Sequence, residues 1–79
     1  MIVKDYLEDL QMIVENSASS PYLAEYIGFA TPGAAASSAN WQIQKLTYDV
    51  NNKLTNKQFA DKSSEFKFIW DNRAGYTYG

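Results

Sequence analysis

The spacing of aromatic residues over positions 66–79 most limits what this 79-residue chain can fold into. The stretch contains five aromatic side chains: Phe66, Phe68, Trp70, Tyr76 and Tyr78. The first three alternate with other residues, and alternation places every second side chain on one face of a strand. The pattern therefore predicts a strand over 65–70 with a buried aromatic face. Residues 71–73 predict a turn, after which residues 74–79 form a last short strand.

Apolar runs bounded by turn residues predict three more strands, over 22–29, 41–50 and 54–60. Pro32 and Gly33 mark a turn after the first run. Asn51 and Asn52 mark a hairpin between the other two, because Asn tolerates the left-handed backbone that tight turns require. Residues 34–40 are small, and they predict a flexible connection or a short helical turn.

Two details within these runs predict local irregularities. Gly28 lies inside the first run, where a glycine indicates a bulge or a close approach of another group to the backbone. In the second run the apolar side of the strand changes between Ile43 and Leu46. Such a change requires either a bulge or a strand that is buried on both faces.

Residues 1–15 differ from the rest because their apolar residues have helical spacing. The apolar positions are Ile2, Val3, Tyr6, Leu7, Leu10, Ile13 and Val14. This pattern predicts an N-terminal amphipathic helix or arm, clearest over 2–11, while residues 12–15 alternatively begin a strand. We expect the helix either to pack on the sheet of its own chain or to dock on a neighbouring subunit.

Together these elements predict a single domain, 1–79, of the mainly β class. We expect a small antiparallel sheet, sandwich or half-barrel of five or six short strands over 22–79, with the N-terminal helix over 1–15. The edge strands of so small a sheet must be paired or covered, and neighbouring copies of the chain would do this.

The chain is short and contains neither cysteine nor histidine. A domain of this size buries only about 60% of its unfolded surface and usually needs disulfides, a metal or oligomerisation for stability. The lack of cysteine excludes disulfides and thiolate metal sites, and the lack of histidine removes the commonest catalytic base. Aromatic residues make up 15% of the chain, which favours assembly through aromatic contacts, with core packing alone as the alternative.

The net charge of −2 is unevenly distributed. Residues 1–25 contain one basic and five acidic side chains, whereas residues 45–73 contain six basic and four acidic ones. This division either steers head-to-tail packing of identical copies or arises by chance. The chain lacks the clustered Lys and Arg of a nucleic-acid binder and the run of about 20 apolar residues of a membrane span. We therefore expect no nucleic-acid and no membrane partner, and synthesis in the cytoplasm without a signal peptide.

No combination of residues predicts catalysis, a cofactor or a metal centre. Asp5, Glu8 and Asp9 share one side of the predicted helix, but calcium requires six to eight oxygens from a shaped loop, so we expect a solvated face. The candidate interface residues are Trp70, Arg73, Tyr76 and Tyr78. An Arg beside a Trp is typical of interface hot spots. Alternatively, Arg73 closes the turn by pairing with Asp71 or with the backbone.

Several sequence blocks occur in a characteristic order over residues 22–79. They read Tyr-Ile-Gly-Phe-Ala-Thr-Pro-Gly at 26–33, Trp-Gln-Ile-Gln-Lys-Leu-Thr-Tyr-Asp at 41–49, Phe-Ala-Asp at 59–61, Ile-Trp-Asp-Asn-Arg-Ala at 69–74 and Tyr-Thr-Tyr at 76–78. In these blocks and their order, the chain resembles small proteins encoded among the virion genes of tailed bacteriophages. The resemblance implies a virion component and carries over no catalytic residues.

The functional prediction is a non-enzymatic structural component of a tailed-phage particle, in its capsid, neck or tail. Such a protein would be made in the host cytoplasm, occur in the virion in many copies or as a homo-oligomer, and bind other phage structural proteins. The alternative is a small intracellular interaction module, an inhibitor or adaptor, that binds a host protein. A carbohydrate-binding module with an exposed aromatic face is a third hypothesis.

Overall fold

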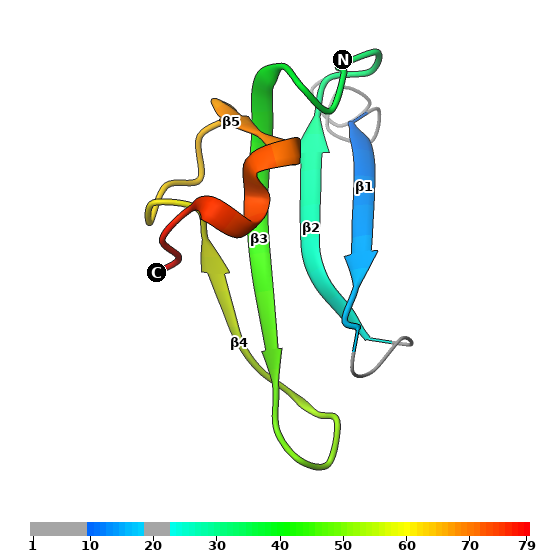
Figure 1. Ribbon diagram of the computed structural model, residues 1–79, viewed down its shortest axis with the longest axis vertical. Helices are drawn as coiled ribbons and strands as arrows, with labels where there is room; N and C mark the ends of the chain where they lie inside the picture. Colours follow the sequence, from blue (N-terminus) through cyan, green and yellow to red (C-terminus); the bar gives the residue numbers. More distant parts are fainter. Residues whose placement is uncertain (1–9, 19–22) are drawn as a thin grey trace, which may run out of the picture.

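The computed structural model of the chain describes residues 10–18 and 23–79. In these residues the chain forms five strands and one 3-10 helix, shown in Figure 1. They are β1 (Gln11–Asn16), β2 (Ala24–Ala30), β3 (Ala39–Tyr48), β4 (Leu54–Phe59), β5 (Phe68–Ile69) and η1 (Trp70–Gly75). Every pair of strands is antiparallel. The predicted mainly β, antiparallel fold is therefore confirmed.

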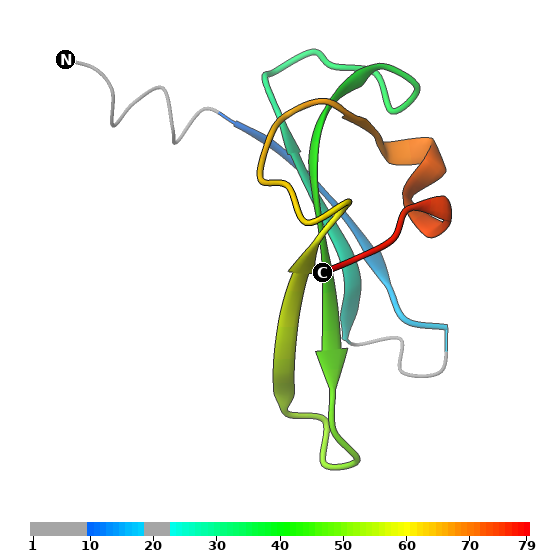
Figure 2. The ribbon, with the colours of Figure 1, turned by 90° about the vertical axis from the view of Figure 1, so that its left-hand side faces the viewer.

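The four longer strands follow one another in space as they do in the sequence, because each of β1 to β4 pairs with the next. β3 is the longest strand and has two partners along one edge: β4 pairs with its C-terminal half and β5 with its N-terminal end (Figure 1). The C-terminal half of β3 extends with β4 as a hairpin that protrudes from the rest of the molecule (Figure 2).

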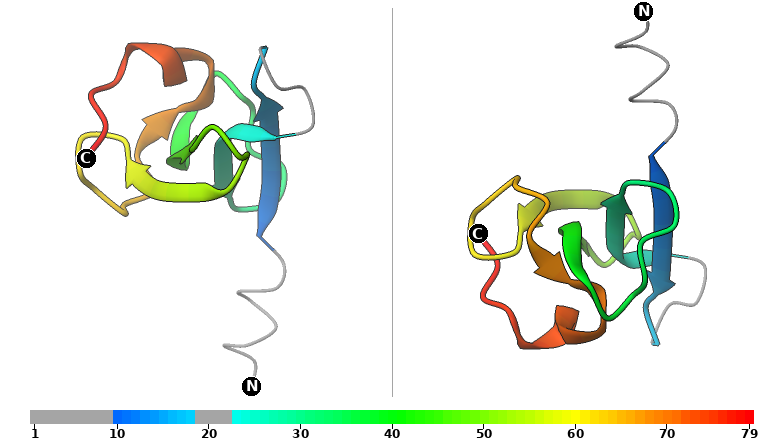
Figure 3. Two further views of the ribbon diagram at one scale, coloured as in Figure 1. Left: turned by 90° about the horizontal axis from the view of Figure 1, so that it is seen from below. Right: turned by 90° about the horizontal axis from the view of Figure 1, so that it is seen from above.

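The register of the strands defines two faces of the sheet. Residues directly opposite each other in an antiparallel pair project to the same side, so Ile13, Gly28 and Ile43 share one face. We call this the inner face, and the opposite side, which carries Val14 and Ile27, the outer face. The sheet curls so that η1 and the residues after it lie against the inner face (Figures 2 and 3).

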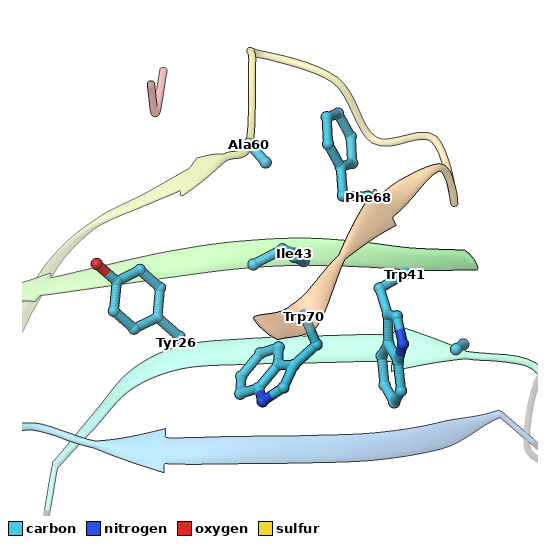
Figure 4. Packing of buried hydrophobic residues seen from close by; sticks show 7 residues of the cluster. Tyr26, Trp41, Ile43, Ala60, Phe68 and Trp70 are labelled. Atoms are coloured by element: carbon cyan, nitrogen blue, oxygen red, sulfur yellow. The ribbon is translucent and has the colours of Figure 1, made fainter. Parts of the chain in front are cut away.

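The buried core lies between the inner face and the C-terminal third of the chain. Its members are at most 8% exposed: Tyr26, Ala30, Trp41, Ile43, Ala60, Phe68 and Trp70. Ring contacts join the two layers, with centroid distances of 6.2 Å for Trp41 and Trp70, the pair that Figure 4 shows, and 5.7 Å for Tyr26 and Tyr78. Within the covering layer, the ring centroids of Phe68 and Tyr76 lie 5.1 Å apart. Aromatic packing is therefore the main contact between the sheet and its covering layer.

Gly28 provides the surface on which Trp70 packs. A Cβ atom at position 28 would lie 2.7 Å from Cε3 and 2.9 Å from Cζ3 of Trp70, closer than side chains tolerate. The indole therefore lies directly on the backbone of β2. This contact confirms the close approach that the glycine within the apolar run predicts.

The small residues between β2 and β3 also contribute to packing. Ala34 and Ala36 pack against the core. The indole nitrogen of Trp41 donates a hydrogen bond to the carbonyl of Ala35 (2.9 Å), and the backbone N–H of Asp71 donates to that of Ala36 (3.1 Å). Small side chains in this connection allow its backbone to reach both the sheet and η1.

The predicted turns are confirmed, whereas the predicted bulge is not where the sequence suggests. Asn52 and Gly33 have positive φ angles of 64° and 89°. The register between β3 and β4 is regular past Ile43 and Leu46, and it shifts only at the C-terminal end of β3. Ile43 is buried on the inner face and Leu46 is half-buried on the outer face. The apolar side changes because both faces of β3 carry an apolar residue.

The predicted N-terminal helix or arm over 1–15 is wrong for residues 11–15, which belong to β1. The alternative that residues 12–15 begin a strand is confirmed. Ile13 and Val14 are β-branched, which favours a strand, and pairing of β1 with β2 provides backbone hydrogen bonds that outweigh the helical spacing. The helix predicted for residues 1–9 lies outside the described residues.

The strand predicted over 65–70 is reduced to two residues, Phe68 and Ile69. Phe66 is 46% exposed, so its predicted burial is wrong. The side chain of Ser63 accepts a hydrogen bond from the N–H of Glu65 (3.2 Å), which holds this part of the chain in a loop.

The last predicted strand, over 74–79, is also shorter than expected. Residues 71–75 continue η1, and a single bridge between Ala60 and Tyr78 replaces the strand. The side chains of Tyr76 and Tyr78 both pack against the core. This segment therefore covers the inner face through side-chain packing and not through strand pairing.

The contact between Gly28 and Trp70 leads to a stability prediction. We expect Gly28→Ala to lower the free energy of unfolding by about 1–3 kcal/mol, because an added methyl group in a packed core displaces its neighbours. Urea denaturation followed by tryptophan fluorescence measures the change. Gly75→Ala is the matched control, since a methyl group added there would meet no heavy atom within 4 Å apart from its neighbours in the chain. Equal destabilisation by both variants would contradict this account.

Candidate functional site

The structure brings the four candidate interface residues together over the inner face. Trp70 and Arg73 lie in η1, and Tyr76 and Tyr78 follow it. Trp70 is only 4% exposed, whereas the other three are half-buried. Most of the surface of these residues is therefore used within the chain, and their role as an interface stays a prediction.

Arg73 connects η1 to the first strand. Its guanidinium lies 4.7 Å from the ring centroid of Trp70, and its Nη1 donates a hydrogen bond to the Trp70 carbonyl (3.1 Å). Its Nε donates to Oε1 of Glu15 on β1 (2.7 Å), forming an ion pair across 58 residues of sequence. The pairing with Asp71 that the sequence suggests is replaced by this contact, while the predicted bond to backbone is present.

The ion pair shifts the protonation equilibrium of its acidic member. The hydrogen bond from Arg73, opposed in part by desolvation, lowers the pKa of Glu15 below its ordinary value of 4.5. The side chains of Glu15 and Arg73 are 43% and 23% exposed respectively, so water and salt weaken their attraction. The ion pair therefore serves mainly to orient Arg73 over Trp70 and adds little to the free energy of unfolding.

The two tyrosine hydroxyls are also hydrogen-bonded within the chain. That of Tyr78 donates to the carbonyl of Arg73 (2.7 Å), and that of Tyr76 accepts from the N–H of Ile69 (2.9 Å). Burial raises the pKa of Tyr78 well above its usual range, so the neutral, donating form is present at physiological pH. These bonds fix the segment after η1 on the sheet.

The outer face of the sheet is the second candidate site. No residue set named from the sequence alone corresponds to this apolar surface. It carries six apolar side chains whose register places them on one side: Met12, Val14, Ile27, Phe29, Leu46 and Phe59. Met12 and Val14 are 59% and 42% exposed, and the other four are half-buried. Within the described residues, no strand or helix forms a second layer on this face (Figures 2 and 3).

Polar side chains on the outer face are hydrogen-bonded to one another. Nε2 of Gln44 donates to Oε1 of Gln42 (3.0 Å), and Nε2 of Gln42 donates to the carbonyl of Ser64 (2.8 Å). The ammonium of Lys57 lies 5.5 Å from the ring centroid of Phe59. The face is thus an apolar surface with a fixed pair of amides and one cation, a composition that suits contact with another protein.

A signal for the outer face is nevertheless present in the sequence. β2 has an aromatic residue on each of its faces, Tyr26 inside and Phe29 outside. β1 likewise alternates Met12 and Val14 with Ile13, and a strand with apolar residues on both faces is typical of burial on both sides. The apolar residues of β1 also fit a helical spacing, so the sequence does not distinguish a strand with two apolar faces from a helix.

The tip of the protruding hairpin is held by a single aspartate. Oδ1 of Asp49 accepts hydrogen bonds from the backbone N–H groups of Asn51 (2.8 Å) and Lys53 (3.0 Å). Val50 at this tip is 97% exposed. The turn is therefore ordered by local bonds, while its apolar side chain lies almost wholly in solvent.

Two further features concern metals and membranes. Among residues 10–18 and 23–79, no group of three or more acidic, histidine or cysteine side chains is placed to hold a metal ion. In the same ranges, no helix is long and apolar enough to cross a membrane.

Comparison with protein-family models, with curated proteins and with solved structures finds no match for this chain.

The ion pair between Glu15 and Arg73 predicts a pH dependence. The pKa of Glu15 is lower in the folded chain than in the unfolded chain. The ion pair therefore contributes its full stabilisation at pH values above the unfolded-state pKa, and this contribution is lost as the pH falls through the folded-state pKa. We expect Glu15→Gln to lower the free energy of unfolding by about 0.5–1 kcal/mol at about pH 7 and to have no effect at about pH 2. Urea unfolding at both pH values measures the difference.

The control for this prediction is Glu65→Gln. The Glu65 carboxylate lies 3.9 Å from Lys67 and its side chain is 72% exposed, so we expect no measurable effect at either pH. A difference between wild type and Glu15→Gln that is the same at both pH values would show that the carboxylate charge is not involved.

Proposed function

We propose that this chain is a non-enzymatic structural component of a tailed-phage particle and binds other virion proteins through the outer face of its sheet. The observation that carries the proposal is the apolar outer face, which has no second layer within the described residues. The resemblance of residues 22–79 to small virion proteins supports the biological setting.

The energetics of the outer face favour a protein partner. Apolar area removed from water contributes about 25 cal/mol per Å², and the outer face offers six apolar side chains to a partner. A neighbouring protein on this face would supply the second layer of a sandwich. The sandwich or half-barrel expected from the sequence would then be completed in the assembled particle.

Many copies in a particle would also cover the strand edges. β1 and β4 are the two ends of the four-strand order. Within the described residues, the free edge of β4 is covered only at its Phe59 end, where Phe59 and Gly79 exchange two backbone hydrogen bonds (2.9 and 3.1 Å). Exposed strand edges promote pairing with other chains. In a regular array of copies, the edge strands of neighbouring copies would pair with one another. A small inhibitor or adaptor that binds one host protein through the outer face is the alternative.

The first test is the composition of the particle. We expect mass spectrometry of purified phage particles, produced from the genome that encodes this chain, to detect it in many copies. If the chain is present in infected cells but absent from purified particles, the structural role is wrong. Recovery of one host protein with the tagged chain would then support the inhibitor or adaptor.

The second test is the outer face itself. We expect Val14→Lys to reduce incorporation into particles at least about tenfold, equivalent to about 1.4 kcal/mol of binding free energy, because a charge replaces a half-exposed apolar contact. Val50→Lys is the matched control, since Val50 lies at the hairpin tip, away from the outer face. Quantitative mass spectrometry of particles provides the measurement, and equal incorporation of both variants would exclude the outer face as the docking surface.

A further inference from the structure

We propose that two copies of the chain pair edge to edge through β1, antiparallel about a twofold axis, and so form one continuous sheet. This inference rests on the proposed function, in which many copies assemble, and it names the edge and the register at which two copies meet. Three features carry it: the open edge of β1, the direction of its backbone groups, and the match of β1 with a reversed copy of itself.

β1 is the more open of the two edges of the sheet. Within residues 10–18 and 23–79, β1 pairs with β2 and with no other strand. The edge of β4 is in part covered by Gly79 and carries Lys57, which would oppose its own charge if two such edges paired. In β1 the single charged side chain, Glu15, is neutralised by Arg73 of its own chain. An open, mostly apolar edge strand favours pairing with another chain.

The backbone groups of Met12 and Val14 point away from the sheet. In an antiparallel ladder, successive residues bond alternately to the strands on either side. The carbonyl of Ile43 accepts a hydrogen bond (3.1 Å) from the residue that follows β4, so Ile43 bonds on the β4 side. Its partner Gly28 therefore bonds to Ile13 of β1. The residues next to Ile13, Met12 and Val14, consequently direct their N–H and C=O groups outward, where a second strand would bond them.

One register of two antiparallel β1 strands overlaps all of residues 10–16. It places Ile13 opposite Ile13 of the second copy and Met12 opposite Val14, so the outward backbone groups of the two strands face one another. Met12 and Val14 are 59% and 42% exposed and lie on the same face of the sheet. Each therefore covers the other across the junction. A shift of two residues would instead place Ile13 opposite the carboxylate of Glu15.

The same register pairs complementary polar side chains on the inner face, because it places Gln11 opposite Glu15 of the second copy. Within the described residues, Oε1 of Gln11 accepts a hydrogen bond from the N–H of Gly33 (3.2 Å), which leaves its amide NH₂ to donate. Glu15 accepts from Arg73 through Oε1 (2.7 Å), which leaves Oε2 to accept. Opposite residues have Cβ atoms about 4.5–5.5 Å apart, within reach of such a bond.

The match of β1 with itself favours a second copy as the partner. A twofold axis repeats both the apolar and the polar match, so one strand supplies both sides of the interface. Strands β2 to β5 of the same chain already have places in the sheet and do not reach this edge. The axis is perpendicular to the sheet, so the outer faces of both copies lie on one side. The pair thereby offers other virion proteins one continuous apolar surface.

The chain contains no cysteine, so a single introduced thiol tests the register. In full-length Ile13→Cys, the two thiols would lie opposite each other at a position where Cα atoms are about 4.5 Å apart, which suits a disulfide. We expect disulfide-linked dimers at least ten times more abundant than with Val50→Cys, quantified by mass spectrometry after mild oxidation. Position 50 is 97% exposed and favoured by random collision. An equal or lower yield from Ile13→Cys would overturn the proposal.

A second pair of variants keeps this test valid if Ile13→Cys fails to fold, as judged by tryptophan fluorescence. Met12→Cys is then mixed with isotopically labelled Val14→Cys, and the disulfide between the two chains is compared with that from Val50→Cys. We expect the same tenfold excess. A segment of the same chain that covered the edge would keep these thiols apart, and the absence of the mixed disulfide would overturn the pairing.

Light scattering with a backbone variant provides an independent measurement. Proline removes the outward N–H of position 14 without removing a bond to β2, and proline is tolerated at such edge positions. At about 100 μM, where even weak specific complexes form, we expect dimers of the wild type and of Val14→Thr but a folded monomer of Val14→Pro. If Val14→Pro does not fold, Met12→Pro replaces it.

A monomeric wild type, or a proline variant that stays dimeric, would overturn the pairing through β1. The virion role is tested separately by the composition of particles. A chain that dimerises but is absent from particles contradicts the virion role alone, and a chain that is present in particles but monomeric in solution contradicts the pairing alone.

Discussion

The indole of Trp70 lies on the bare backbone of Gly28, and the arrangement of the inner face depends on this contact. Because β2 has no side chain at that position, the ring reaches the sheet and packs beside Trp41. The guanidinium of Arg73 lies over the indole ring, and the carboxylate of Glu15 on the edge strand β1 accepts a hydrogen bond from Arg73. A glycine in the second strand thus determines how the last quarter of the chain meets the first strand.

The two faces of the sheet differ in what covers them. In the aromatic layer on the inner face, the polar atoms of Trp41, Tyr76 and Tyr78 are hydrogen-bonded. No buried side-chain nitrogen or oxygen in residues 10–18 and 23–79 lacks a partner. The outer face has apolar side chains but, in the same residues, no such layer. A domain this small gains limited stability from one covered face, so the association proposed for the outer face would contribute to folding as well as to assembly.

Sequence patterns predict the strands well where turn residues bound an apolar run, and poorly where distant contacts decide the local structure. The alternation around Trp41 and the two asparagines at 51 and 52 identify β3, β4 and their hairpin. β1 is ambiguous because Ile13 and Val14 fit a helix as well as a strand, and only pairing with β2 decides between them. Phe66 alternates regularly with Phe68, but it lies in a loop and is 46% exposed. The ion pair of Glu15 with Arg73 could not be predicted, because no local pattern connects residues that are so far apart.

The two halves of β3 have different partners, and this difference affects how readily each half unfolds locally. Its N-terminal half is held by β2, β5 and the aromatic layer, whereas its C-terminal half is held mainly by the exposed hairpin. Local opening costs less where few apolar contacts must be broken. Amide protons of a single continuous strand will therefore exchange with solvent in two classes, slowly near Trp41 and Ile43 and rapidly near Thr47. The two halves of this one strand therefore differ in how much free energy their local opening requires.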